Sequence, residues 1–95
     1  MTVHEIMCNK FEIGDRVVVQ ETRLLQLYRK CFYKNVDISR NIFWKNAWVE
    51  SMNHCYGTVY KITSISLRHG IYLDITFRDI IQTPAFPSFC LKKVK

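Results

Sequence analysis

The stretch GTVYKITSISLRHGIYLDITFR, residues 57–78, decides the expected fold, because it predicts a β-hairpin. Residues 57–67 are rich in β-branched and aromatic types, which favour strands. Arg68-His69-Gly70 has the composition of a turn. Apolar and polar side chains then alternate, with Ile71, Leu73, Ile75 and Phe77 on one face and Tyr72, Asp74, Thr76 and Arg78 on the other. This period of two indicates a half-buried strand at 71–78 that pairs antiparallel with residues 57–67.

A valine-rich strand is predicted before the hairpin, at residues 15–20. It follows Gly14, which can take a positive φ, and Asp15, whose carboxylate can bond the neighbouring backbone. Because side chains alternate along a strand, Val17 and Val19 share one face. Val18 lies on the other face, and we expect both faces to be partly covered.

The C-terminal part of the chain is broken by two prolines, Pro84 and Pro87. Proline lacks the N–H that a central strand needs, so residues 82–87 are expected to interrupt the sheet. Residues 88–94 then have room for two short closing strands.

Residues 21–53 change the hydrophobic period and predict a helical insertion between the first and second strands. One helical stripe contains Leu24, Leu27, Tyr28, Cys31 and Phe32, with Thr22 as the expected N-cap and Leu25 off the stripe. A second short helix is expected after Asp37 or Ser39, either of which can cap it. Further along, Trp44, Trp48 and Met52 recur every four residues, a spacing more typical of core positions than of a ligand site.

Length and charge fit one small basic domain spanning residues 1–95, with a formal net charge of +6. The positive charge gathers in residues 21–40 and at the C-terminus, and such charge favours acidic partners. No apolar run approaches the roughly 20 residues that span a bilayer, and residues 1–12 do not resemble a secretory signal. We therefore expect a cytoplasmic protein that does not bind membranes, with its four cysteines as free structural thiols.

Catalytic and metal chemistry find little support in the sequence. Zinc needs three or four converging ligands, whereas His54 and Cys55 are consecutive and would point to opposite faces of a strand. Cys31 falls on the apolar helical stripe, away from the basic residues beside it. The three glycines are too far apart for a phosphate-cradling loop. We expect no catalytic residue, no metal site and no cofactor.

The candidate binding residues are the cations and rings of the insertion: Arg23, Arg29, Lys30, Tyr33, Lys34, Arg40 and Trp44. Cations neutralise phosphates and aromatic rings stack on bases, so the set suits a nucleic acid. The same residue types dominate protein interfaces. A third interpretation is a solvated surface with no partner. Trp44 has the further alternative of a core position, and the apolar helical stripe leaves a homodimer open as well.

The chain also resembles small Src-homology-3-like barrel proteins of phage type. The resemblance lies in Phe11-x-x-Gly14-Asp15 before the valines, Trp48-x-x-x-Met52, Gly57-x-Val59, Leu73-x-Ile75-x-Phe77 and Phe86-Pro87-x-x-x-Leu91. It covers Phe11–Val19 and Trp48–Val94 and leaves residues 20–47 unmatched. It implies a five-stranded barrel and an origin in a phage or mobile element. Together with the helical insertion predicted at residues 21–53, the expected fold is an α+β barrel with one or two helices between its first and second strands.

These features together favour a non-enzymatic interaction protein. Its expected partner is a host or phage protein in the host cytoplasm, which it binds with or without inhibiting it. The alternative function is a basic nucleic-acid-binding module. Small barrels vary their function through inserted loops, so we expect the insertion at 21–53 to carry the activity.

Overall fold

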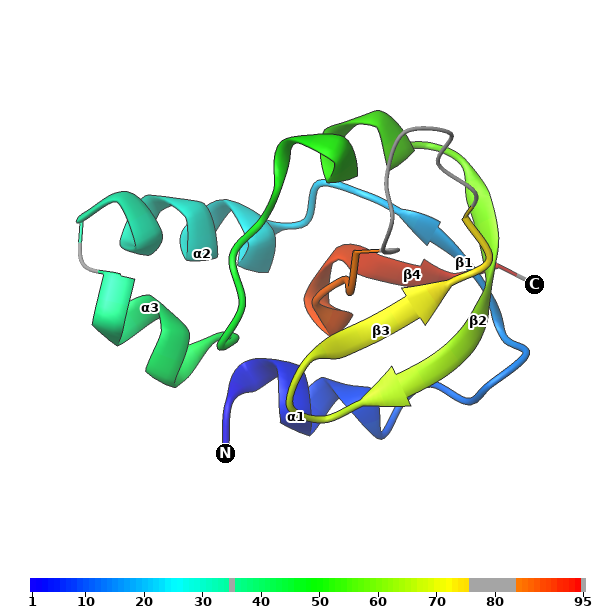
Figure 1. Cartoon of the computed structure of the whole chain (residues 1–95), viewed down its shortest axis with the longest axis horizontal. Helices are drawn as coiled ribbons and strands as arrows, with labels where there is room; N and C mark the ends of the chain where they lie inside the picture. The colour runs from blue at the N-terminus through cyan, green and yellow to red at the C-terminus, as the bar shows by residue number, and fades with distance from the viewer. Residues whose placement is uncertain (35, 76–83, 95) are drawn as a thin grey trace.

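The computed structural model describes residues 1–34, 36–75 and 84–94. Its elements, in chain order, are α1 (Val3–Cys8), β1 (Arg16–Val19), α2 (Arg23–Lys34), α3 (Val36–Ile42), the 3-10 helix η1 (Glu50–Cys55), β2 (Val59–Ser66), β3 (Gly70–Leu73), the 3-10 helix η2 (Ser88–Cys90) and β4 (Leu91–Lys93). The strands form one antiparallel sheet in the order β3-β2-β1-β4. The helical pair α2 and α3 stands on one side of the molecule, opposite β1 and β2 (Figure 1).

The expected closed five-stranded barrel is wrong, since the described residues form an open four-stranded sheet. The hairpin that decided the expectation is present as β2 and β3, with Ile65 paired to Ile71. β3 ends at Leu73. On the edge of β3 that faces away from β2, the described residues add only a single bridge, from Ile71 to Phe86. The predicted strand positions 76–78 lie outside the residues that the structure describes.

The C-terminal segment supplies one closing strand instead of two, because Ser88 bonds to α1. Its N–H donates to Nδ1 of His4 (2.8 Å) and its hydroxyl donates to the carbonyl oxygen of His4 (2.8 Å). Residues Ser88–Cys90 therefore turn into η2, and Cys90 N–H bonds back to the Pro87 carbonyl (3.3 Å). β4 then pairs with β1.

The opening turn and β1 match the expectation. Gly14 has a φ of 95°, and the carboxylate of Asp15 accepts the N–H of Glu12 (2.9 Å). Val17 and Val19 are fully buried. The alternation of side chains thus sets which face of β1 meets the core.

Helix α2 has the expected extent, and the Thr22 hydroxyl caps it by accepting the N–H of Leu25 (3.1 Å). Its buried face is rotated from the predicted stripe, however. Leu25, placed off the stripe, is fully buried, whereas Leu27 is 43% exposed. Tyr28 fixes this rotation, because its hydroxyl donates to the Asn46 carbonyl (2.5 Å) and its ring packs edge-on against Trp44.

Helix α3 begins at Val36, so Asp37 and Ser39 lie inside the helix and the expectation that either caps it is wrong. In the repeat of Trp44, Trp48 and Met52, the first two residues lie in a non-helical segment, and only Met52 lies in a helix, η1. Trp44 and Met52 are nevertheless buried, as expected of core positions, and Trp48 packs against the core.

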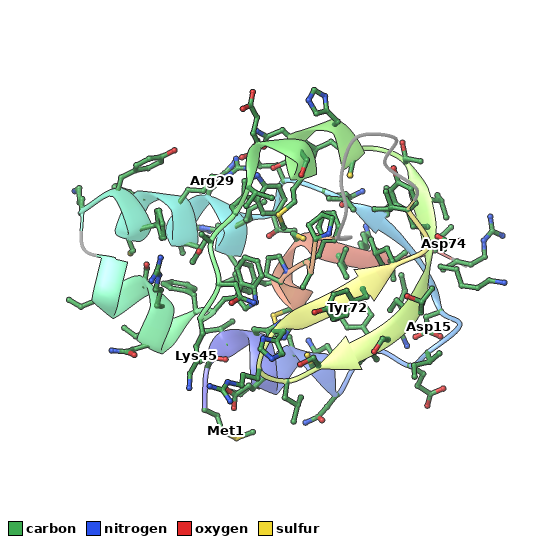
Figure 2. The ribbon with its side chains drawn as sticks, viewed as in Figure 1. Met1, Asp15, Arg29, Lys45, Tyr72 and Asp74 are labelled. Carbon is green, nitrogen blue, oxygen red and sulfur yellow. The ribbon has the colours of Figure 1, made fainter. Side chains whose placement is uncertain are left out.

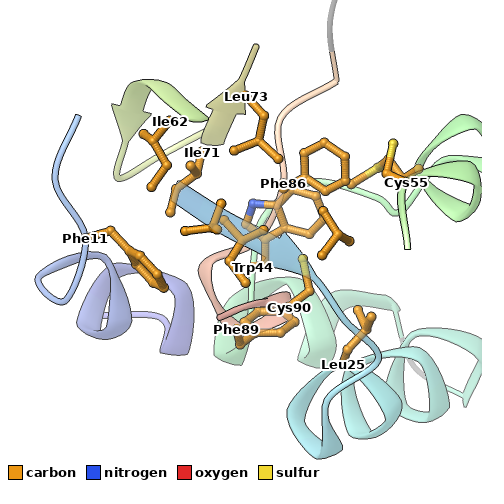
Figure 3. Packing of buried hydrophobic residues seen from close by; sticks show 14 of the residues in the cluster. Phe11, Leu25, Trp44, Cys55, Ile62, Ile71, Leu73, Phe86, Phe89 and Cys90 are labelled. Atoms are coloured by element: carbon orange, nitrogen blue, oxygen red, sulfur yellow. The ribbon is translucent and has the colours of Figure 1, made fainter. Parts of the chain in front are cut away.

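The core joins the inner face of the sheet to α2 and to the C-terminal segment, with Leu25, Trp44, Phe86 and Phe89 among its largest members (Figure 3). Helix α1, which the sequence patterns did not predict, starts at the N-cap Thr2. None of the described helices has the length and apolar character needed to cross a membrane.

Candidate functional site

The predicted binding residues of α2 divide between an exposed face and a half-buried one. Its exposed face, here called the α2 surface, consists of Arg23, Gln26, Leu27, Lys30, Tyr33 and Lys34. Tyr33 is 86% exposed, and α2 itself contains no acidic residue. Among the residues that the structure describes, no ion pair within 4 Å involves the three cations of this surface.

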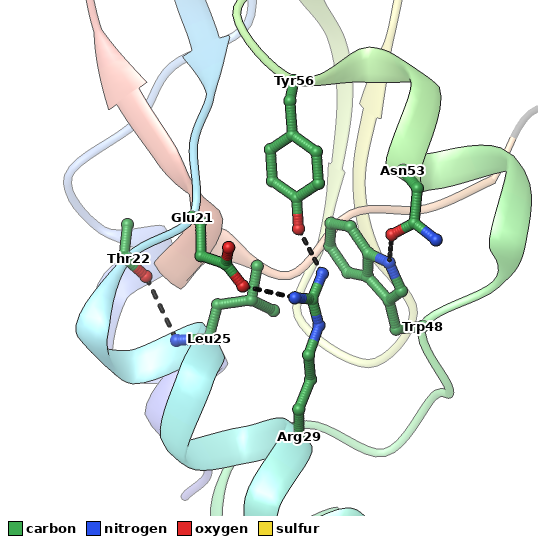
Figure 4. A network of polar contacts seen from close by, with 7 residues as sticks. All are labelled: Glu21, Thr22, Leu25, Arg29, Trp48, Asn53 and Tyr56. Carbon is green, nitrogen blue, oxygen red and sulfur yellow. Dashed lines mark hydrogen bonds and ion pairs between the residues drawn. The ribbon is translucent and has the colours of Figure 1, made fainter.

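Arg29, by contrast, is engaged within the protein (Figure 4). Its guanidinium donates to the carboxylate of Glu21 and to the hydroxyl of Tyr56. Its Cζ atom lies 4.9 Å from the ring centroid of Trp48, within the range of a cation–π contact. Arg29 therefore holds α2 against the segment around Trp48. It is not part of the α2 surface.

A small pocket, here called the α2 pocket, opens beside the α2 surface and has about 50 Å³ of free volume. It is lined by Tyr28, Arg29, Phe32, Tyr33 and Trp48. A cavity that holds benzene has about 150 Å³, so this pocket suits the tip of an aliphatic side chain better than a ring.

The Trp48 ring is already engaged at the edge of this pocket. It stacks on Tyr56 with centroids 5.8 Å apart and an interplanar angle of 27°, and its Nε1–H donates to Asn53 Oδ1 (2.7 Å). The contact between Trp48 and Arg29 joins residues far apart in the sequence. The sequence assigned Trp48 to the core and so missed it as a pocket residue; no local pattern connects it with α2.

The remaining two predicted binding residues lie apart from the α2 surface. Trp44 is only 1% exposed and donates its Nε1–H to the His69 carbonyl (3.2 Å), which assigns it to the core. Arg40, on α3, is exposed and lies over the ring of Phe32, with Cζ 5.7 Å from the centroid. Arg40 thus borders the pocket through Phe32.

A Cys–His pair that the sequence analysis did not predict lies on α1, where Cys8 Sγ is 3.4 Å from His4 Nε2. The four-residue spacing was the signal, since it places both on one helical face. His4 Nδ1 accepts the N–H of Ser88, so Nε2 carries the proton and donates to the Ser66 carbonyl (3.0 Å). Burial raises the pKa of the Cys8 thiol to about 11. The pair is therefore a structural contact, with no free base to activate the thiol.

The other thiols and acids do not assemble into a reactive site either. Burial raises the pKa of Cys55 and Cys90, which opposes formation of the thiolate. Within the described part of the chain, no three His, Cys, Asp or Glu side chains converge as metal ligands would. Every buried side-chain nitrogen or oxygen described there has a hydrogen-bond partner.

Comparisons of the chain with protein-family models, with curated proteins and with solved structures find no match. The function is therefore inferred from the geometry of the chain itself.

Proposed function

We propose that this chain is a non-enzymatic interaction protein that binds an acidic segment of a protein partner through the α2 surface. One observation carries the proposal: Lys30, Tyr33 and Lys34 are exposed beside a pocket that is lined mainly by aromatic rings. Cations with an aromatic anchor are the residue types that dominate protein interfaces. The partner would place carboxylates against the lysines and one aliphatic side chain in the α2 pocket.

The pocket favours a protein over a nucleic acid at this surface. Base recognition by stacking needs an open ring face. The ring of Trp48 is occupied by Tyr56 and Arg29. Tyr33, which is 86% exposed, keeps a ring on which a base could stack, so the preference for a protein rests on the pocket. A free volume of about 50 Å³ suits the end of a leucine or methionine side chain better than a flat base.

The identity of the partner is proposed from the sequence resemblance. Phage-type proteins of this size motivate a host or phage protein as the target, with or without inhibition of that target. The barrel that the resemblance implied is absent from the described residues, and the matched residues lie outside 20–47, so the resemblance motivates the kind of partner and not the binding surface.

A nuclear magnetic resonance titration tests the proposal with a defined probe. The probe is a short peptide with a central leucine flanked by two acidic residues on each side. The protein has two tryptophans, hence two indole N–H signals. We expect the Trp48 signal and the α2 amides to shift on titration, while the Trp44 signal stays in place because its ring is buried.

Two controls sharpen this experiment. The peptide with alanine in place of leucine should bind more weakly, because the pocket stays empty. The variant Lys30→Glu/Lys34→Glu should weaken binding about 5- to 30-fold, since each surface charge pair contributes about 0.2–1 kcal/mol and reversal adds repulsion. A stationary Trp48 signal at millimolar peptide would contradict the proposal.

A further inference from the structure

The sheet has a second basic surface, on its outward face. Residues directly opposite in an antiparallel pair project to the same face. Arg16 pairs with Lys61, and Val18 pairs with Val59 on one side and with Lys92 on the other. Val17 and Val19, which alternate with them along β1, are buried. The sheet surface defined in this way consists of Arg16, Val18, Val59, Lys61 and Lys92.

The charges of the sheet surface repel one another. Arg16 and Lys61 are exposed and lie directly opposite, an arrangement of like charges that destabilises a sheet. No ion pair within 4 Å relieves it among the described residues. The carboxylate of Asp15 contacts Lys93 (3.3 Å), and that of Asp74 accepts the backbone N–H of Lys61 (2.8 Å).

The sheet surface also lies away from the α2 surface. Strands β1 and β2 stand on the opposite side of the molecule from α2 and α3 (Figure 1). Asp15 and Asp74, which flank the sheet surface, lie far across the molecule from Arg29 of α2 (Figure 2). A ligand on the sheet surface would therefore leave the α2 surface free.

We propose that the sheet surface binds the sugar–phosphate backbone of a nucleic acid without sequence preference. Three cations project from it. The carboxylate beside Lys61, that of Asp74, accepts the Lys61 backbone N–H (2.8 Å), and release of counterions from phosphates drives such binding. None of its five residues is aromatic, and Tyr72 of β3, which projects to the same face, is half-buried, so we expect phosphate contacts to contribute more than stacking on a ring. Contacts to phosphates carry no sequence information. The net charge of +6 speeds the encounter with such a polyanion.

The test is fluorescence anisotropy with a labelled 20-nucleotide single strand and a labelled 20-base-pair duplex, between about 50 and 200 mM KCl. Three phosphate contacts predict a salt slope of about −2.1 for the single strand, hence an affinity loss of about 20-fold over that range. For the duplex the expected slope is about −2.7 and the loss about 40-fold. Two unrelated duplex sequences should bind alike.

Matched variants locate the binding. Arg16→Gln/Lys61→Gln/Lys92→Gln should abolish most of the affinity and of the salt slope. Arg23→Gln/Lys30→Gln/Lys34→Gln removes the same charge from α2 and should retain both. Thermal melting checks that each variant folds. The single change Lys92→Gln, on the three-residue strand β4, provides a milder version that should reduce the single-strand slope by about 0.7.

Four results would overturn the inference. They are the absence of binding at 50 mM salt, an equal loss in the two triple variants, a strong preference between the two duplex sequences, and displacement of the oligonucleotide by poly-glutamate as readily as by unlabelled oligonucleotide. The last result would make the surface a site for acidic protein.

Discussion

The rotation of α2 decides which of its side chains are free to bind a partner, and two leucines two residues apart test it. Leu25 is fully buried, and Leu27 is 43% exposed. Truncating a buried leucine to alanine costs about 3–5 kcal/mol, because the transfer free energy of the removed atoms is lost and the cavity left behind adds a further cost. For a domain of this size, 3 kcal/mol lowers the melting temperature by about 12–24 °C. Leu27→Ala should cost less than about 1 kcal/mol.

Urea titration and thermal melting, both followed by circular dichroism, measure the two variants against the parent protein. Leu27→Ala makes the same change in the same helix, so it controls for the effect of the substitution on the helix itself. If Leu27→Ala destabilised the protein as much as Leu25→Ala, the stripe predicted from the sequence would be the buried one. The α2 surface would then be partly covered, and the proposed site would fail with it.

Three further predictions concern His4, the four cysteines and Arg29. Burial holds the pKa of His4 below its ordinary value, so the unfolded chain binds more protons than the folded one and stability should fall as the pH drops below about 6.5. Urea midpoints measured from pH 8 to pH 5 should show this fall, and an equal fall in the variant His4→Gln would refute the assignment to His4. In the native protein iodoacetamide should label Cys31 first, because the other three thiols are buried, whereas in urea it should label all four cysteines. A second label added as fast as the first to the native protein, measured by mass spectrometry, would contradict this burial. Arg29→Lys should lower the free energy of unfolding by about 1 kcal/mol, because it weakens the contacts of residue 29 with Trp48 and Glu21. The control Arg23→Lys, at an exposed position, should melt like the parent protein, and equal melting temperatures of the two variants would argue against a stabilising role of the Arg29 contacts.

Local sequence patterns predicted those elements whose cause is local. The valines of β1, the turn at Gly14 and the cap at Thr22 depend on neighbours within a few residues, and each is present in the structure. The closing strand at 88–90 was predicted wrongly because the partner of Ser88 is His4, at the other end of the chain. A bond across such a separation leaves no trace in the period of the sequence.

The candidate site shows the same division. Helical spacing was enough to find the exposed cations Lys30 and Lys34. It could not find the buried face, because Leu24 and Leu25 both begin acceptable apolar stripes and only the packing of Tyr28 on Trp44 selects one. The side of the pocket formed by Trp48 depends on its contact with Arg29, which tertiary structure alone creates.

Site-specific photocrosslinking tests the central claim most directly, because it reports what touches the α2 surface. A photoreactive phenylalanine analogue replaces Tyr33 in one protein and Ile13, which is 68% exposed on the opening turn, in a control. After irradiation in a lysate of the native cell or host, we predict one adduct with an acidic protein at position 33, weakened by Lys30→Glu/Lys34→Glu and absent at position 13. Adducts with nucleic acid at position 33, or the same adducts at both positions, would contradict the account.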